Sequence, residues 1–492
     1  MIRICFVIFF LLWNSTCFSQ STFLESFYTA GTAQNMFGKK TSDSGYILYG
    51  FNYFTGNNLF TKTDSNGIVA FSKYYNLPND YRVYDAFENQ NGYTLLSTGI
   101  NNSVCFIKTD QNGMFISGKS YYSSQGQFNL NWLGQIGSDI YLYGRIGNSS
   151  ALIKTDSSNA ILWSKVYTAS GFYRGAISKN NELYLGIVQG PSNPLSGISK
   201  FDSTGNPIWN IQFQPLGGSR FDITEESGVI VSNSNYVMKF DSLGTILWSK
   251  FYNVDTSHQI ISLGIKTIKS NGYIIAGNYE LKNASYPSPA FLLHIDQQGI
   301  ANWIKTYGIT NRQVVASFEV ASDSGYVVIG TTEGFASTSS QSGFIFKTDP
   351  VGNLGCYDIP ISITDSNFAT SSTSFTLTYS SVTLSDSLFL PIPIVTNEPS
   401  NFICSSTTNI NHHKKLKGHL FPNPTDDHAT LVVSENENYK FIGYDIFGKI
   451  IFQSTINSLE TELDFSNLPN GIYFYQLGNS ENNFTGKFIV AH

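Results

Sequence analysis

Charged side chains are scarce in this 492-residue sequence, where they make up only 13% of the residues, against roughly 25% in an average soluble domain. Acidic residues outnumber basic ones by 35 to 29, which gives a formal net charge of −6. The chain therefore has no basic field for a phosphate backbone, and nucleic acid is not expected as a partner. The His-Glu-x-x-His and Gly-x-Ser-x-Gly motifs of common hydrolases are also missing from the sequence.

Long apolar runs are missing beyond the N-terminus, so no transmembrane segment is expected. Residues 1–19 read as a secretory signal, because Arg3 is followed by ten apolar residues, fewer than the about 20 that a spanning helix needs. We expect cleavage after Ser19, which leaves Gln20 as the first residue. Lipidation of Cys17 is the weaker alternative, because Asn14 stands where a lipoprotein signal needs an aliphatic residue.

Cysteine and histidine are too few for an evident metal site. Three cysteines remain after removal of the signal, and none has Cys-x-x-Cys spacing. Three histidines cluster at positions 412, 413 and 419, but they lie among lysines, as in a solvated connector. We expect no metal and no cofactor. Calcium is a minor alternative, since Asp-x-Asn-Gly resembles a fragment of a calcium loop without the longer ligand series.

Aromatic residues (15%) and glycines (42 of them) are abundant instead, as is typical of strands joined by turns. One motif recurs seven times: an apolar residue, a Lys, an Asp two residues on, and a turn ending in Gly. The copies begin at Lys62, Lys108, Lys154, Lys200, Lys239, His294 and Lys347. A bulky residue follows nine positions after the Lys and an aromatic one follows four later, as with Trp163 and Tyr167.

Each residue of the motif has a mechanical reason. The Asp side chain can accept backbone N–H groups to form a turn, and the Gly supplies the positive φ that closes a hairpin. The spacing of four places Trp163 and Tyr167 on one face of a returning strand. We therefore expect the repeated Asp to form turns without a catalytic role. We expect the repeated Lys to run along apolar neighbours with its charge in water.

Four short strands in about 46 residues match the size of one propeller blade. The sequence predicts an all-β chain with a seven-bladed β-propeller over residues 20–357. Residues 23–28 look like a returning strand without a motif before it, so we expect them to form the outer strand of the last blade and to close the ring. An open solenoid is the alternative, but it needs capping repeats that the sequence lacks.

Residues 358–416 are rich in Ser and Thr and lack the repeat, so they are interpreted as a linker with extended strands packed beside the last blade. The exported compartment is oxidising, which permits one disulfide, and we expect it between Cys356 and Cys404. The structural hairpin of each repeat resembles the blade signature of quinoprotein propellers. The full SGY…KTDxxGxxxW pattern resembles propellers found among type IX secretion cargo.

Residues 417–492 resemble the type A sorting domain of type IX secretion cargo, which implies a small β-sandwich. Three linked motifs carry this resemblance, at 420–424 (LFPNP), 444–451 (YDIFGKII) and 468–475 (LPNGIYFY). The marker residues are Pro422, Asn423, Pro424, Gly448, Lys449, Pro469, Gly471, Tyr473 and Lys487. The resemblance implies recognition by the secretion machinery and release or attachment at the outer cell surface.

Function, if it is local, is expected on the propeller face that carries the long connections between strands. Exposed aromatic residues there can stack on sugar rings or anchor a protein. The candidate ligand-binding residues are Tyr53, Phe54, Phe172, Tyr173, Arg174, Tyr279 and Tyr286. The favoured hypothesis is a monomeric, non-catalytic binding or adhesion protein with a glycan or protein ligand. The alternative is an extracellular glycan hydrolase or lyase with its site on the same face.

Overall fold

The computed structural model describes residues 21–27, 34–52, 56–77, 82–99, 103–168, 171–177, 180–189, 195–214, 220–282, 289–308, 313–333, 342–388, 392–394, 400–407, 418–433, 438–446, 448–478 and 483–492. The expected signal therefore lies outside the described residues. Two compact units divide the chain at Thr408/Asn409. Throughout the described ranges the regular structure is β-strand, as the sequence predicts.

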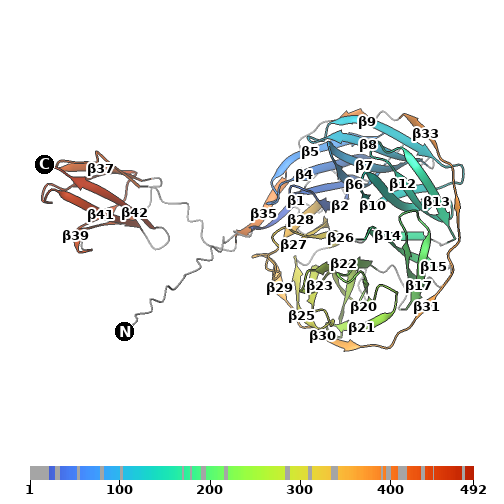
Figure 1. Cartoon of the computed structure of the whole chain (residues 1–492). Helices are drawn as coiled ribbons and strands as arrows, with labels where there is room; N and C mark the ends of the chain where they lie inside the picture. Colours follow the sequence, from blue (N-terminus) through green and yellow to red (C-terminus); the bar gives the residue numbers. More distant parts are fainter. Residues whose placement is uncertain are drawn as a thin grey trace, which may run out of the picture. The chain divides into compact units, whose positions relative to one another are not determined.

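The first unit contains, within the described residues, seven antiparallel sheets of five strands each, arranged as the blades of a ring (Figure 1). The innermost strands of blades 1 to 7 are β2 (Gln34–Lys40), β6 (Arg82–Asn89), β10 (Phe128–Ile136), β14 (Gly171–Ile177), β18 (Arg220–Ile223), β22 (His258–Ile268) and β26 (Gln313–Val320). The second strands are β3 (Tyr46–Asn52), β7 (Gly92–Gly99), β11 (Asp139–Ile146), β15 (Leu183–Gln189), β19 (Val229–Asn233), β23 (Gly272–Leu281) and β27 (Tyr326–Thr332).

The outer half of each blade follows the same order. The third strands are β4 (Asn57–Thr63), β8 (Ser103–Asp110), β12 (Ser149–Thr155), β16 (Leu195–Phe201), β20 (Tyr236–Phe240), β24 (Ala290–Ile295) and β28 (Ser342–Lys347). The fourth strands are β5 (Val69–Asn76), β9 (Phe115–Tyr122), β13 (Ile161–Tyr167), β17 (Pro207–Phe213), β21 (Ile246–Asn253), β25 (Ala301–Tyr307) and β1 (Ser21–Phe27).

The N-terminal strand closes the ring as predicted. β1 pairs antiparallel with β28, so the start of the chain supplies the fourth strand of blade 7. Phe23 and Phe27 of β1 have the spacing of four that Trp163 and Tyr167 have in blade 3. The seven-bladed propeller is thereby confirmed.

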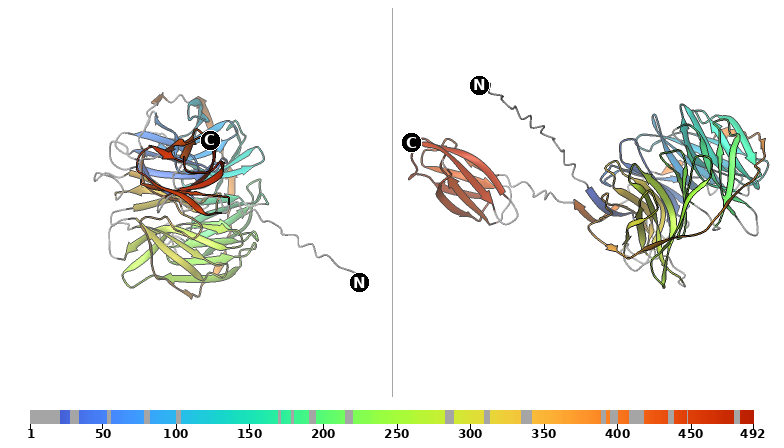
Figure 2. Two further views of the ribbon diagram at one scale, coloured as in Figure 1. Left: turned by 90° about the vertical axis from the view of Figure 1, so that its left-hand side faces the viewer. Right: turned by 60° about the horizontal axis from the view of Figure 1, so that its bottom comes forward.

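The segment after blade 7 is an outer strap (residues 358–407) that adds a fifth strand to every blade. Its strands are β29 (Asp358–Pro360), β30 (Thr364–Asn367), β31 (Ser372–Ser374), β32 (Tyr379–Ser381), β33 (Ser385–Leu388), β34 (Ile392–Ile394) and β35 (Ser400–Thr407). They pair in turn with blades 6, 5, 4, 3, 2, 1 and 7. Figures 1 and 2 show this orange segment following the outside of the ring. The expectation of strands beside the last blade alone was wrong.

The strap can pair with every blade because its apolar residues recur with a period of seven residues. Ile361, Phe368, Phe375 and Val382 recur at that spacing, and each backbone N–H donates to a carbonyl of a fourth strand, at 3.2–3.4 Å. Each of these side chains also packs, partly buried, against the core of the neighbouring blades. One strap period therefore covers one blade, and the polar residues between the anchors face water.

The Asp–Gly turns have the expected geometry. In blade 4, Asp202 Oδ1 accepts hydrogen bonds from the backbone N–H groups of Thr204 and Asn206, both at 2.9 Å. Gly205 closes the turn with φ of +77°, a region that side chains rarely adopt. The turn also binds the preceding blade, because Tyr167 OH donates to the Gly205 carbonyl at 2.7 Å.

This contact between blades repeats around the ring. Tyr121, Tyr252 and Tyr307 donate in the same way to the carbonyls of Asn159, Gly299 and Gly352, each at 2.7 Å. Aromatic rings also pack against the next turn, so a Cβ on Gly205 would lie only 2.8 Å from the Trp163 ring. The Tyr and Gly of the sequence motif are therefore two halves of one interface.

The repeated lysine does not end in water, so that expectation was wrong. Five of these lysines, four of them buried and Lys154 partly exposed, pair with a carboxylate at the turn between the first two strands of their own blade. The pairs are Lys62–Asp43 (2.9 Å), Lys154–Asp139 (2.7 Å), Lys200–Glu182 (2.9 Å), Lys239–Glu226 (3.8 Å) and Lys347–Asp323 (2.7 Å).

Cys356 is disulfide-bonded, whereas Cys105 is a buried thiol whose Sγ lies 2.7 Å from Ser120 Oγ. Cys404 on β35 lies opposite Leu24 of β1, and Leu24 belongs to the buried cluster against which Cys356 packs. These positions favour the pairing of Cys356 with Cys404, which stays a prediction. A cross-linked peptide in a non-reduced digest would support it, and Cys404 found as a free thiol would contradict it.

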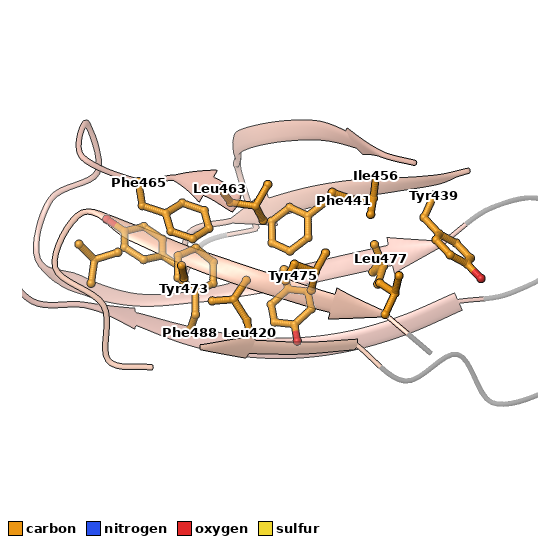
Figure 3. Packing of buried hydrophobic residues seen from close by; sticks show 14 residues of the cluster. Leu420, Tyr439, Phe441, Ile456, Leu463, Phe465, Tyr473, Tyr475, Leu477 and Phe488 are labelled. Atoms are coloured by element: carbon orange, nitrogen blue, oxygen red, sulfur yellow. The ribbon is translucent and has the colours of Figure 1, made fainter. Parts of the chain in front are cut away.

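The second unit is a small β-sandwich. One sheet has the order β36 (Gly418–Phe421), β37 (His428–Val433) and β40 (Glu460–Asp464). The other has the order β39 (Ile450–Ile456), β38 (Tyr439–Tyr444), β41 (Gly471–Gly478) and β42 (Asn483–Val490). Figure 3 shows the aromatic core, in which Phe465 stacks on Phe488 with ring centroids 4.5 Å apart. Alternating residues of β41 point into this core, as the period of a half-buried strand requires.

The contact between blades can be tested at Tyr252, whose side chain is fully buried. Tyr252→Phe keeps the ring but leaves the Gly299 carbonyl without its donor, so we expect a loss of about 1–2 kcal/mol in the free energy of unfolding. Tyr379→Phe is the matched control, because Tyr379 is exposed and donates to Asn206 on the surface. Urea unfolding measures both, and equal losses would contradict the assigned role.

Candidate functional site

The innermost strands of the blades surround a central cavity of about 900 Å³. The antiparallel order of each blade places the Asp–Gly turns at one end of the cavity, here called the turn face. The longer connections lie at the other end, the loop face. The inner strands run from the loop face toward the turn face. A residue early in an inner strand therefore lies near the loop face, and a later residue lies near the turn face.

The backbone register sorts the main charged side chains of the cavity into two layers. The turn-side layer holds Lys39, Asp222, Lys266 and Glu319, whose strand partners are Ile47, Ile230, Ile274 and Val327. The loop-side layer lies two residues earlier on the strands. It holds Asp85, Arg174 and Arg220, whose partners are Leu96, Gly186 and Ser232.

Asp85 joins three blades. Its carboxylate pairs with Lys39 and accepts hydrogen bonds from Tyr49 OH (2.9 Å) and the backbone N–H of Trp132 (2.7 Å) and Ala86 (2.8 Å). Burial lowers the pKa of Lys39, and the charge of Asp85 opposes that shift. Burial, together with the nearby Asp85 charge, raises the pKa of Tyr49 well above its usual value. Asp85 therefore has a fixed structural set of donors.

The two other carboxylates of these layers, Glu319 and Asp222, are also engaged. Glu319 lies 3.3 Å from the Lys266 ammonium, and its charge raises the pKa of Lys266. Asp222 accepts the backbone N–H of Thr267 at 2.7 Å. These contacts hold blades 5, 6 and 7 together at the turn-side layer.

Arg174 and Arg220 converge on one backbone oxygen. Arg174 Nη2 donates to the Leu263 carbonyl at 3.3 Å, and Arg220 Nε donates to it at 3.2 Å. Leu263 lies at a β-bulge of β22, where the pairing shifts between Ser262 and Gly264. A bulge leaves its extra residue outside the ladder, which explains why this carbonyl is available to the arginines.

The candidate ligand residues have different outcomes. Arg174 lines the cavity and does not belong to a surface loop. Phe172 and Tyr173 are on β14, but their side chains lie outside the described residues, as do Tyr53, Phe54 and Tyr286 entirely. Of the seven candidates, only Arg174 and Tyr279 have described side chains, and they belong to different blades, so the grouping of the seven stays a prediction.

Tyr279 takes part in a small cluster near the loop face. Its OH donates to Asp255 Oδ2 at 2.9 Å, and its ring stacks on His258 with centroids 4.5 Å apart. Burial and the Asp255 carboxylate raise the pKa of Tyr279 to about 12. Asp255 also accepts the backbone N–H groups of Ser257 and His258. This cluster stabilises its own connection.

The charged residues of the cavity were not identified from the sequence, although their positions in the repeat follow a pattern. Lys39, Lys266 and Glu319 each stand seven residues before the Tyr that opens the next strand, Tyr46, Tyr273 and Tyr326. Charged residues at a fixed position of repeated inner strands must meet in the middle of a closed ring.

The marker residues of the tail hold its ends together. Asn423 donates to the Lys487 carbonyl (3.1 Å) and accepts the Ile489 backbone N–H (2.9 Å), which fixes the first motif to the last strand. Its neighbours Pro422 and Pro424 are exposed, as is Lys487. The last residue, His492, lies 3.1 Å from Asp427.

The other marker residues shape turns. Gly448 has φ of +80° and, with Lys449, closes the turn that Asp445 begins. Tyr473, two residues after Gly471, is buried and donates to the Pro469 carbonyl at 2.7 Å.

In the described ranges of the chain, no helix is long and apolar enough to cross a membrane. Among the same residues, no group of three His, Cys, Asp or Glu side chains is arranged to hold a metal ion.

The strand topology defines a β-propeller, and comparison with known families defines the tail. Residues 419–491 match the family described as the secretion system C-terminal sorting domain. The chain therefore carries a type IX sorting domain and is exported to the cell surface or the extracellular space. A comparison with curated proteins found no match.

Several solved structures are similar. The Dos1 propeller is 12% identical with a TM-score of 0.41, over 61% of this chain and 74% of that one. Sqt1 from Chaetomium thermophilum is 13% identical with a TM-score of 0.37, over 67% and 97%. The polysaccharide lyase Uly1 is 7% identical with a TM-score of 0.37, over 66% and 91%. The assignment of the fold rests on the strand topology itself.

The structural role of Asp85 can be tested with Asp85→Asn. The change leaves Lys39 in the cavity wall without its counter-charge, so we expect a loss of roughly 2–4 kcal/mol in the free energy of unfolding. Asp386→Asn is the control, because Asp386 pairs with Lys119 on the surface and is half-exposed. Denaturant unfolding of both variants checks this, and an unchanged stability of Asp85→Asn would contradict it.

Proposed function

We propose that this exported protein is a non-catalytic binding protein that acts in adhesion or ligand capture. Its ligand enters the central cavity from the loop face. Arg174 and Arg220 lie in the loop-side layer, so a ligand from that face reaches them before the ion pairs of the turn-side layer. The sorting domain supports a place of action outside the cell, either released or attached to the surface.

The observation that carries this proposal is the commitment of the acid–base groups in the cavity. Hydrolysis of a glycosidic bond uses one carboxyl group as an acid and a second as a base or nucleophile. Asp85 already accepts four hydrogen bonds, and Glu319 is paired with Lys266. Neither is left to exchange a proton with a substrate.

Two buried tyrosines of the cavity, Tyr49 and Tyr143, are also poor bases. Burial raises the pKa of Tyr143 to about 12, and that of Tyr49 lies well above the usual value. Both hydroxyls keep their protons at neutral pH, so neither can take a proton from a sugar ring as a lyase requires. The cavity is also lined by cations, aromatic rings and hydrogen-bond donors. Such groups bind a ligand without reacting with it.

A polysaccharide array read for both binding and product release tests the proposal. We expect the purified exported chain to retain at least one polysaccharide without forming new reducing ends or unsaturated sugars. Product that forms with wild type and disappears with Asp85→Asn or Glu319→Gln would establish the enzyme alternative. A chain that retains none of the polysaccharides would contradict the proposed glycan ligand.

A further inference from the structure

We propose that Arg174 and Arg220 form a binding site for an oxyanion, the carboxylate or sulfate group of an acidic polysaccharide. This inference rests on the proposed function and adds the chemical class of the ligand. Nothing in the sequence motifs assigns such a site, because the two arginines come from different blades, β14 and β18.

The first argument is the donor capacity of the Arg174 guanidinium. Each guanidinium carries five N–H donors in a rigid fork that matches a carboxylate or a sulfate. Arg174 donates one hydrogen bond to the Leu263 carbonyl. Among the described residues, Arg174 makes no ion pair with a carboxylate. Because the same carbonyl holds Arg220, the two cationic groups lie side by side.

The second argument is the local charge. The two layers hold four cationic side chains and three carboxylates, so their formal charge is +1, in a chain whose net charge is −6. Asp85 and Glu319 are paired with lysines, and Asp222 is held by a backbone N–H. The excess positive charge therefore falls on the arginine pair, where an anion can neutralise it.

The third argument concerns the body of the ligand. Tyr84 and Trp132 also line the cavity, and Tyr84 is 39% exposed. Trp132 stacks on Phe87, with ring centroids 5.7 Å apart, which keeps its indole in place. The exposed Tyr84 ring, in the same cavity as the two arginines, suits a ligand that combines flat apolar sugar faces with acidic groups, so we favour a polysaccharide over an acidic peptide.

The test compares acidic polysaccharides with their neutralised forms. The panel contains a polygalacturonate with its methyl ester, a sulfated galactan with its desulfated form, and poly-glutamate. Binding by the full exported chain is measured by calorimetry at two salt concentrations. We expect at least tenfold tighter binding to one acidic polysaccharide than to its neutral form, and weaker binding at high salt.

The variants are Arg174→Gln, Arg220→Gln and Arg174→Lys. A lost charge-assisted hydrogen-bond pair should weaken acidic binding by about tenfold or more in either Gln variant. Arg174→Lys keeps the charge without the fork, so its loss should be smaller. Arg145→Gln is the matched control, because Arg145 also donates to a backbone carbonyl, that of Gly147, but lies outside the cavity lining. Thermal unfolding verifies that each variant is folded.

The outcomes separate the two proposals. Binding of the acidic polysaccharide with full affinity in Arg174→Gln would overturn the oxyanion site and leave the binding function intact. Preference for poly-glutamate would overturn the polysaccharide assignment. No binding to any member of the panel would overturn the oxyanion site, and the polysaccharide array then tests the binding function separately. Losses in Arg145→Gln equal to those in Arg174→Gln would also count against the site.

Discussion

Neighbouring blades meet through the turn of the repeat, and in four of these contacts a turn glycine accepts a hydrogen bond from a tyrosine of the preceding blade. In blades 3 and 4 the contact joins Trp163 and Tyr167 to Gly205, with no room for a Cβ on the glycine. The ring can close only if such contacts repeat at one angle around it. These repeated contacts also form the central cavity, because they hold the inner strands that line it at a common depth.

The outer strap makes the ring a single structure. The fourth strand of a blade is an open edge with unpaired backbone groups, which invites aggregation. Strap strands pair with every such edge, and the apolar anchors at intervals of seven residues pack between blades. The N-terminal β1 and the last strap strand β35 pair with each other in blade 7, so both ends of this unit are tied to the same sheet.

The repeat and the tail could be predicted from the sequence because their motifs are local. In the repeat, the turn formed by Asp202 and Gly205 and the ring of Trp163 that packs against it lie within one period of the sequence. In the tail, Asn423 belongs to a short continuous motif. The strap and the cavity could not be predicted in the same way. A strap strand of three or four residues has no pattern of its own, and its period of seven has meaning only against a ring of blades. Arg174 and Arg220 meet because two blades converge, a relation that depends on the closed fold.

The central claim is that the cavity holds an acidic group between two arginines. A crystal structure of the exported chain with a bound acidic oligosaccharide tests it most directly. The account predicts a carboxylate or sulfate within hydrogen-bond distance of both Arg174 and Arg220, with Asp85 still bound to Lys39. An oligosaccharide bound on the outside of the ring, with both arginines on the Leu263 carbonyl alone, would contradict it.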